Sequence, residues 1–409
     1  MTQESGAEVP LRQNRSFRIL WTSQIASEFS GEILATIAPL LVIFGGGSET
    51  EVGLTMGATA LALMIMALPA GVIADRVDLR AVMVGAQLCR LLAVASLLVA
   101  LIVGEFHLMH LVAVMFLEGV LTALFAPAEH SALSRAVAKG QLRSAIAVNV
   151  GRPFIAALLA PMLAGYAFEV NHWLPAGLFV LMIAFSVLGL VRLRLPDRRD
   201  APGGDAPLQS PVRALGEGLS WALRRGGIRG ALAWMLVANL MLHTLIILAV
   251  LGVTGAGGSG GDVGLIMAGI GLGGVVGGLA AQLIVQRLAA RWLLAGLGTG
   301  LAAAALGVSG VLVSPLWVAG YLALGAVLAP VANAIIISFI LETAPEDMRG
   351  RASSAASFLG NGSSALGPVL GGAAAGAWGV APVLLGLAAA SGLLALCGLG
   401  LRAAGRAER

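Results

Sequence analysis

The chain has 409 residues, of which 58% are hydrophobic and 11% are charged, and its mean hydropathy is +0.93. So few polar side chains cannot cover a water-soluble globule of this size, which excludes that class and indicates a membrane protein. The formal charge of +4 would suit a nucleic-acid partner, but the basic residues are spread over seven polar segments rather than gathered on one face. We therefore expect no nucleic-acid binding.

Twelve apolar stretches follow in chain order, each long enough to cross a bilayer. A crossing needs about 20 mostly apolar residues, and a single segment there must be helical because lipid offers the backbone no hydrogen bonds. The predicted spans are 17–44, 51–74, 80–103, 108–128, 144–168, 175–192, 229–253, 262–285, 292–313, 316–341, 352–377 and 381–401. The sequence thus predicts an all-α membrane protein with twelve transmembrane helices.

The basic residues predict the orientation of these spans. All 25 Lys and Arg residues lie either in alternate polar segments or deep within spans, and the intervening segments near Gly45, Glu105, Asn171, Gly257, Ser314 and Trp378 contain none. Because Lys and Arg favour cytoplasmic loops, both termini are predicted to be cytoplasmic. A bias to Arg over Lys suggests GC-rich coding, so we expect a multi-pass protein of a bacterial cell (inner) membrane.

The chain also repeats itself at a fixed offset. The segments 71–80 and 160–165 have counterparts 207 residues later, at 278–287 and 367–372. The repeat predicts two six-helix bundles at 1–194 and 228–409, with a substrate site at their interface near the bilayer midplane. The segment 195–227 between them is rich in Pro, Gly and charge, and reads as a cytoplasmic linker with an amphipathic surface helix from Pro211 to Arg225.

Charged residues within the spans carry the mechanistic argument. A charge at the bilayer centre costs at least about 2.5 kcal/mol, so each should line a cavity or pair with another. At 1.5 Å per residue, four of them lie at a common depth of roughly 13–16 Å. These four are Glu28, Arg90, Glu118 and Arg152. Gln24, Glu28, Glu32 and Thr36 recur every four residues and predict one polar stripe that faces a cavity.

Two interpretations of these charges remain open. They form either a proton relay, or fixed ion pairs that hold the helices together. Coupling or substrate contact is favoured for Glu28 and Glu118, whereas neither interpretation is preferred for Glu32, Arg90 and Arg152. Glu129 is placed near the end of its span, and we expect it to pair with Arg135 or Arg143.

The second half has few polar groups within its spans. Asn239, His243, Asn333 and Asn361 are candidate contacts to a substrate, although interhelical hydrogen bonds account for such residues equally well. No HExxH or Walker sequence occurs, so we expect neither an enzyme nor ATP-driven transport, and no cofactor or metal.

Four strings of the sequence are informative together: ADRVDLR (74–80), PAEHSAL (127–133), APMLAG (160–165) and MRGRASS (348–354). They resemble motifs of the major facilitator superfamily, and most of all of its branch of enterobactin exporters and macrolide efflux pumps. The resemblance implies a cytoplasmic gating motif at Gly71, Asp75, Arg76 and Arg80, although Asp78 and Leu79 depart from the family pattern. In this role the motif would favour one of the two access states of the transporter. The alternative is that its arginines only set the topology of the chain.

The resemblance also implies a function. Ala160, Pro161 and Gly165 match the family's antiporter motif, with Ala160 in place of the usual glycine. We expect a proton-coupled exporter of a small amphipathic compound, such as a siderophore, antibiotic or drug-like metabolite. Its partners would be that substrate, protons and the lipid bilayer, and the family default is a monomer. The alternatives are an uptake or facilitated-diffusion carrier, and a non-transporting receptor or assembly factor.

Overall fold

The computed structural model describes residues 11, 13–67, 69, 70, 73, 77–150, 152–193, 211–345 and 348–400, and every regular element in these ranges is helical. The helices are α1 (Arg15–Phe44), α2 (Glu49–Met66), α4 (Leu79–Val103), α5 (Leu108–Ala136), α6 (Leu142–Val150), α7 (Arg152–Val170), α8 (Leu174–Val191), α9 (Pro211–Leu223), α10 (Gly226–Gly255), α11 (Gly260–Arg287), α12 (Ala290–Gly310), α13 (Pro315–Ala326), α14 (Ala329–Thr343), α15 (Arg349–Trp378) and α16 (Val380–Gly400).

The all-helical membrane architecture predicted from the sequence is confirmed. Within the described residues, ten segments are long and apolar enough to cross a membrane, with α13 and α14 counted as one. The ten do not include α2, which starts with two glutamates, or α15, which is rich in small and hydroxyl-bearing residues. The count of twelve spans therefore stays a prediction.

Several helix bounds differ from the predicted spans. The span at 316–341 is divided into α13 and α14, because Pro330 at the start of α14 cannot donate a backbone hydrogen bond into the preceding turn. The span at 144–168 is divided into α6 and α7. Helix α5 continues through Pro127 to Ala136 instead of ending at residue 128. Helix α2 ends at Met66, and much of the predicted remainder lies outside the described residues.

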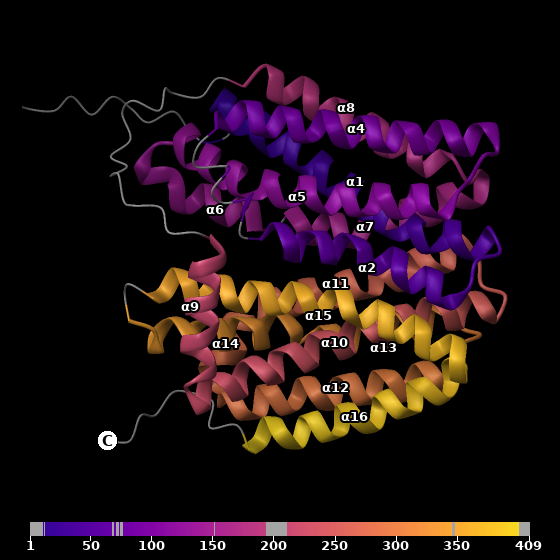
Figure 1. Ribbon diagram of the computed structural model, residues 1–409, viewed down its shortest axis with the longest axis vertical. Helices are drawn as coiled ribbons and strands as arrows, with labels where there is room; N and C mark the ends of the chain where they lie inside the picture. Colours follow the sequence, from indigo (N-terminus) through magenta and orange to yellow (C-terminus); the bar gives the residue numbers. More distant parts are fainter. Residues whose placement is uncertain are drawn as a thin grey trace, which may run out of the picture.

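The helices gather into two groups on either side of a shared interface. In Figure 1, α1 to α8 occupy the upper part of the molecule and α10 to α16 the lower part, with α9 crossing one end. Two pairs, α2 with α15 and α7 with α11, make most of the contact between the groups. One end of the helix bundle carries Arg15, Arg80, Arg192 and Arg349, and we call it the arginine-rich end.

Glycines allow both helix pairs to approach closely, and they follow the sequence repeat. A side-chain carbon at Gly260 of α11 would lie 2.9 Å from the carbonyl oxygen of Gly165 on α7. A side-chain carbon at Gly372 of α15 would lie 3.1 Å from Cα of Gly53 on α2. Gly260 and Gly372 lie 207 residues after Gly53 and Gly165, respectively. The two contacts are therefore equivalent under the internal repeat, as close helix packing through small residues allows.

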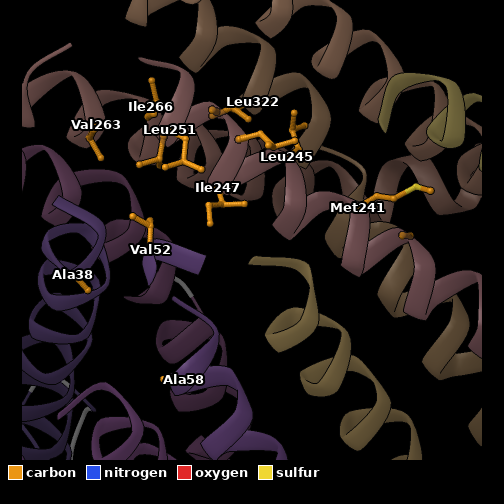
Figure 2. Packing of buried hydrophobic residues seen from close by; sticks show 14 of the residues in the cluster. Ala38, Val52, Ala58, Met241, Leu245, Ile247, Leu251, Val263, Ile266 and Leu322 are labelled. Carbon is orange, nitrogen blue, oxygen red and sulfur yellow. The ribbon is translucent and has the colours of Figure 1, made fainter. Parts of the chain in front are cut away.

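Apolar packing continues across both groups. One buried cluster includes Ala38, Val52 and Ala58 from α1 and α2 together with residues of α10, α11 and α13. Figure 2 shows Leu245 and Leu251 of α10 close to residues of the neighbouring α13 and α11. This packing fixes the positions of the helices that carry the charged side chains described next.

Candidate functional site

A cavity of about 550 Å³ lies beside the interface, between α1, α2, α4 and α5 on one side and α10, α11 and α15 on the other. Most of the surface that lines it is apolar, and the side chains of Met56, Met115, Met267 and Phe125 contribute to this surface. The polar and charged side chains in the wall are Gln24, Ser27, Glu28, Thr59, Arg90, Glu118, Thr122, Glu129, His243, Asn361 and Ser364. Most of them come from the N-terminal helices.

The predicted polar stripe on α1 only partly faces this cavity. Gln24 and Glu28 line it, whereas Glu32 and Thr36 do not. Four residues advance a helix by about 400°, so each step of the stripe turns roughly 40° away from the cavity. The wall instead follows Gln24, Glu28 and Gly31, at the spacing of one helix face. The hydroxyl of Thr36 donates to the carbonyl oxygen of Glu32 at 2.8 Å.

Arg90 on α4 is the centre of a fully bonded cluster. Its Nε donates to Oε2 of Glu118 on α5 at 2.8 Å, and its Nη2 bonds the other carboxylate oxygen. Its Nη1 donates to Ser27 Oγ at 2.6 Å and to Gln87 Oε1 at 2.8 Å. Arg90 and Glu118 are only 3% and 6% exposed. A two-pronged pair with its remaining donors bonded is the geometry expected of a stable buried ion pair.

Arg152 at the start of α7 has a different environment. Its Nη2 donates to Glu129 Oε1 of α5 at 2.7 Å and lies 3.3 Å from Glu28 Oε1 of α1. Although Arg152 is only 5% exposed, its Nε and Nη1 have no hydrogen-bond partner within the described part of the chain. Oε2 of Glu28 and Nε2 of Gln24 are likewise buried and unpaired there. One guanidinium therefore serves two carboxylates through a single nitrogen, and its other two nitrogens have no partner among the described residues.

The partner predicted for Glu129 was wrong. Glu129 pairs with Arg152, rather than with Arg135 or Arg143, and it lines the cavity. The prediction ended the span at residue 128, whereas α5 runs to Ala136 and keeps Glu129 inside the helix bundle. Prolines within membrane helices are tolerated because neighbouring groups satisfy the freed backbone atoms, so α5 can continue through Pro127.

The polar candidates of the C-terminal helices fall into two sets. His243 and Asn361 line the cavity, on α10 and α15 respectively. Nδ1 of His243 bonds the carbonyl oxygen of Asn239 at 2.8 Å, which assigns the ring proton to that nitrogen. Asn239 and Asn333 lie outside the lining and approach each other, with Nδ2 of Asn239 3.4 Å from Oδ1 of Asn333. These two asparagines thus form an interhelical contact.

The two family motifs lie away from the cavity or outside the described residues. Gly71, Asp75 and Arg76 of the gating motif are not described, and Arg80 donates a hydrogen bond to the carbonyl oxygen of Val191 on α8. Ala160, Pro161 and Gly165 lie on α7, within the predicted span 144–168. Ala160 is fully buried, and Pro161 and Gly165 contact glycines of α11. The antiporter-like motif therefore sits in the interface between the two helix groups.

Two polar participants were not singled out from the sequence. Gln87 is fully buried, accepts from Arg90 and donates to Ser186 Oγ at 3.0 Å. Its spacing of three residues before Arg90 places both on one helix face, which was an available signal. Ser27 has the same relation to Gln24, and a strict period of four along α1 does not include it.

The geometry separates two kinds of chemistry. The Arg90 cluster holds α1, α4 and α5 together with matched charge. Near Arg152, two carboxylates share one guanidinium, so a proton or a ligand group would change the charge balance there. Three carboxylates and two guanidiniums in all belong to these clusters.

Comparison with known proteins places this arrangement in a family. The chain is 24% identical over 351 residues to the enterobactin exporter EntS of Shigella flexneri, covering 83% of this chain and 80% of that protein. Its fold resembles a POT family transporter solved with 5-aminolevulinic acid, with a TM-score of 0.73 at 12% identity, covering 95% of this chain and 96% of the other. It also resembles the nucleoside transporter NupG, with a TM-score of 0.74 at 13% identity, covering 95% and 99%.

The solved structures are too distant in sequence to indicate more than a shared fold. The family model described as Major Facilitator Superfamily matches residues 20–368, which is most of the chain and includes both ion-pair clusters. The chain is therefore a multi-pass membrane protein that belongs to the Major Facilitator Superfamily of transporters.

Proposed function

We propose that this protein is a secondary active exporter that exchanges protons for a small amphipathic compound, such as a siderophore, an antibiotic or a drug-like metabolite. A volume of about 550 Å³ lies within the range of roughly 300–1,000 Å³ that small-molecule pockets span. An apolar wall with a few polar groups suits a molecule of mixed character, and methionines in the wall can adapt to its shape. The similarity to an enterobactin exporter supports outward transport.

The transport cycle proposed here uses the two halves, 1–194 and 228–409, as rocking units joined by the linker 195–227. Two glycine contacts that are equivalent under the repeat join the halves. Both contacts involve the ends of helices that lie away from the arginine-rich end. We propose that the arginine-rich end is cytoplasmic, and that rocking about these contacts opens the cavity to each side in turn.

Glu28 is the proposed proton-binding group. It lines the cavity, one of its oxygens is unpaired, and it is the more distant of the two carboxylates that share Arg152. A proton from the outer solution would neutralise Glu28 and leave Arg152 paired with Glu129 alone. Release of that proton to the cytoplasm restores the negative charge and draws the guanidinium back. The motion of Arg152 between its two partners is the proposed link between proton binding and helix movement.

Everted membrane vesicles provide the test, because their interior corresponds to the outside of the cell. With the interior acidified, enterobactin or the macrolide erythromycin should accumulate inside, and the acid gradient should fall when the compound is added. Glu28→Gln should abolish both signals at an unchanged amount of protein in the membrane. Glu32→Gln is the matched control, since Glu32 lies one turn along the same helix outside the cavity lining, and it should retain both.

The same vesicles distinguish the other functions. Movement of the compound out of everted vesicles would indicate uptake, and accumulation that ignores the acid gradient would indicate facilitated diffusion. A protein that moves neither compound and leaves the gradient intact would contradict the export proposal for these two substrate classes. Equal exchange by the wild type and Glu28→Gln would contradict the proposed proton site.

A further inference from the structure

A second cavity, of about 600 Å³, lies at the arginine-rich end and shares no lining residue with the cavity described above. It is formed by the beginning of α1, the beginning of α4 and the end of α8. Three arginines from three different helices line it, together with Ser16, Ile19, Val191 and Leu193. The arginines are Arg15, Arg80 and Arg192, and all three are exposed.

The three guanidiniums are not neutralised by carboxylates within the described part of the chain. Arg80 donates to the carbonyl oxygen of Val191, and neither Arg15 nor Arg192 takes part in an ion pair there. Asp78 is the acidic residue nearest to Arg80 along the chain. It caps α4 by accepting from the amide of Ala81 and does not line the cavity. The pocket therefore presents three positive charges to one volume, which favours an anion.

Helix ends modify this charge in both directions. Arg15 and Arg80 lie in the first turns of α1 and α4, where the helix dipole adds partial positive charge. Arg192 caps the end of α8, where the dipole is negative and offsets part of its charge. Two of the three helix termini thus reinforce the attraction for an anion.

Exposed apolar side chains lie further along two of the helices that form this pocket. Helices α4 and α8 pack side by side, and large apolar side chains of both remain open to the surroundings. They include Leu88 and Leu92 on α4 and Phe185 and Leu188 on α8, with exposures of 41% to 68%. In a membrane-spanning chain this surface faces acyl chains, so the pocket lies where a lipid headgroup meets its hydrocarbon.

From this combination we infer that Arg15, Arg80 and Arg192 form a binding site for the phosphate of an anionic phospholipid headgroup. The acyl chains of that lipid lie along the apolar surface of α4 and α8. Basic pockets between membrane helices bind such headgroups through charge-assisted hydrogen bonds from guanidinium groups. A free phosphate ion offers the same headgroup chemistry without the acyl chains, so the apolar surface favours the lipid.

Binding of phosphatidylglycerol to the purified full-length protein in detergent tests the proposal. Substitution of both Arg15 and Arg192 by Gln should weaken the apparent affinity about 30-fold, because each arginine near an anionic headgroup contributes a factor of roughly five. Arg18→Gln is the matched control, since Arg18 is an exposed arginine on the same helix outside this cavity. It should bind within about twofold of the wild type.

Other outcomes would overturn the inference. These are an unchanged affinity in the double variant, an equal loss in Arg18→Gln, or equal binding of zwitterionic phosphatidylcholine. Displacement of the lipid by millimolar inorganic phosphate would assign the pocket to a free anion instead. If the double variant does not fold, Arg15→Gln and Arg192→Gln are measured singly, and each should weaken binding about fivefold. The readout is independent of transport, so it stands apart from the export proposal.

Discussion

The N-terminal helices contain two buried arginines whose surroundings differ in one essential respect. Arg90 faces a single carboxylate with two parallel bonds, and Ser27 and Gln87 bond its remaining nitrogen. Arg152 faces two carboxylates and leaves two nitrogens unpaired within the described residues. The two arginines are similarly buried, with exposed fractions of 3% and 5%. The number and balance of their partners therefore distinguish the two sites.

This difference indicates where motion is possible. A satisfied pair loses several hydrogen bonds if either member moves, so it fixes the helices that carry it. A guanidinium with two competing partners has two alternative arrangements of similar contact, which is what a bistable element requires. We therefore assign rigidity to the Arg90 cluster and propose that switching takes place at Arg152. The following variants test that distinction, in order of their expected cost to folding.

Arg90→Met should have the largest effect on stability. It leaves Glu118 buried without its cation, and breaking a buried pair in this way costs about 3–5 kcal/mol. The midpoint of thermal unfolding in detergent measures the loss. The double variant Arg90→Met with Glu118→Gln should recover most of it, because no uncompensated charge remains. A single variant that unfolds at the wild-type temperature would mean that the Arg90 cluster does not hold the helices together.

Arg152→Met should cost less, about 1–3 kcal/mol, because the existing guanidinium is incompletely bonded and the two carboxylates line a cavity rather than the packed interior. The same unfolding assay gives the comparison with Arg90→Met. We expect gradient-driven exchange in vesicles to be lost while the protein remains folded. A larger destabilisation than that of Arg90→Met would reverse the roles assigned to the two arginines.

The general architecture could be predicted from the sequence because it depends on local properties. Apolar runs predict helices, and the 207-residue offset relates the interface glycines Gly53 and Gly260 before any coordinates are known. The depth of Arg90 and Glu118 follows from helix rise alone. These features do not depend on the exact residues at which the helices begin and end.

Pairing could not be predicted because it depends on helix rotation and on where helices end. Glu32 was grouped with Glu28, yet the drift of about 40° per four residues takes it out of the cavity wall. Glu129 was assigned to a helix end, yet α5 continues past Pro127 and delivers it to Arg152. In both cases the rotation of a helix, or the residue at which it ends, decides where the charged side chain lies.

Ser27→Ala isolates one bond of the Arg90 cluster. It removes the hydroxyl that accepts from Nη1 at 2.6 Å but leaves Gln87 bonded to the same nitrogen. The free energy of unfolding should fall by about 1.5–2 kcal/mol, at the lower end of the range for one hydrogen bond to a charged group, because Gln87 still accepts from the same nitrogen. Denaturant titration in mild detergent measures it, with exchange in vesicles retained. Loss of exchange at normal stability would indicate that Ser27 acts in transport.

Glu129→Gln should have the smallest cost to folding, within about 1 kcal/mol, because the amide oxygen still accepts from Arg152 and Glu28 still supplies a charge. The informative quantity is the rate of gradient-driven exchange. With Glu129 neutral, Arg152 has only Glu28 as an ionised partner, so the guanidinium should remain there and hinder proton binding. We expect exchange to slow several-fold and to recover when the outer side is made more acidic, whereas Glu28→Gln should not recover at any pH. Equal behaviour of the two variants would mean that the carboxylates are interchangeable, and the competition for Arg152 would then not be the switch.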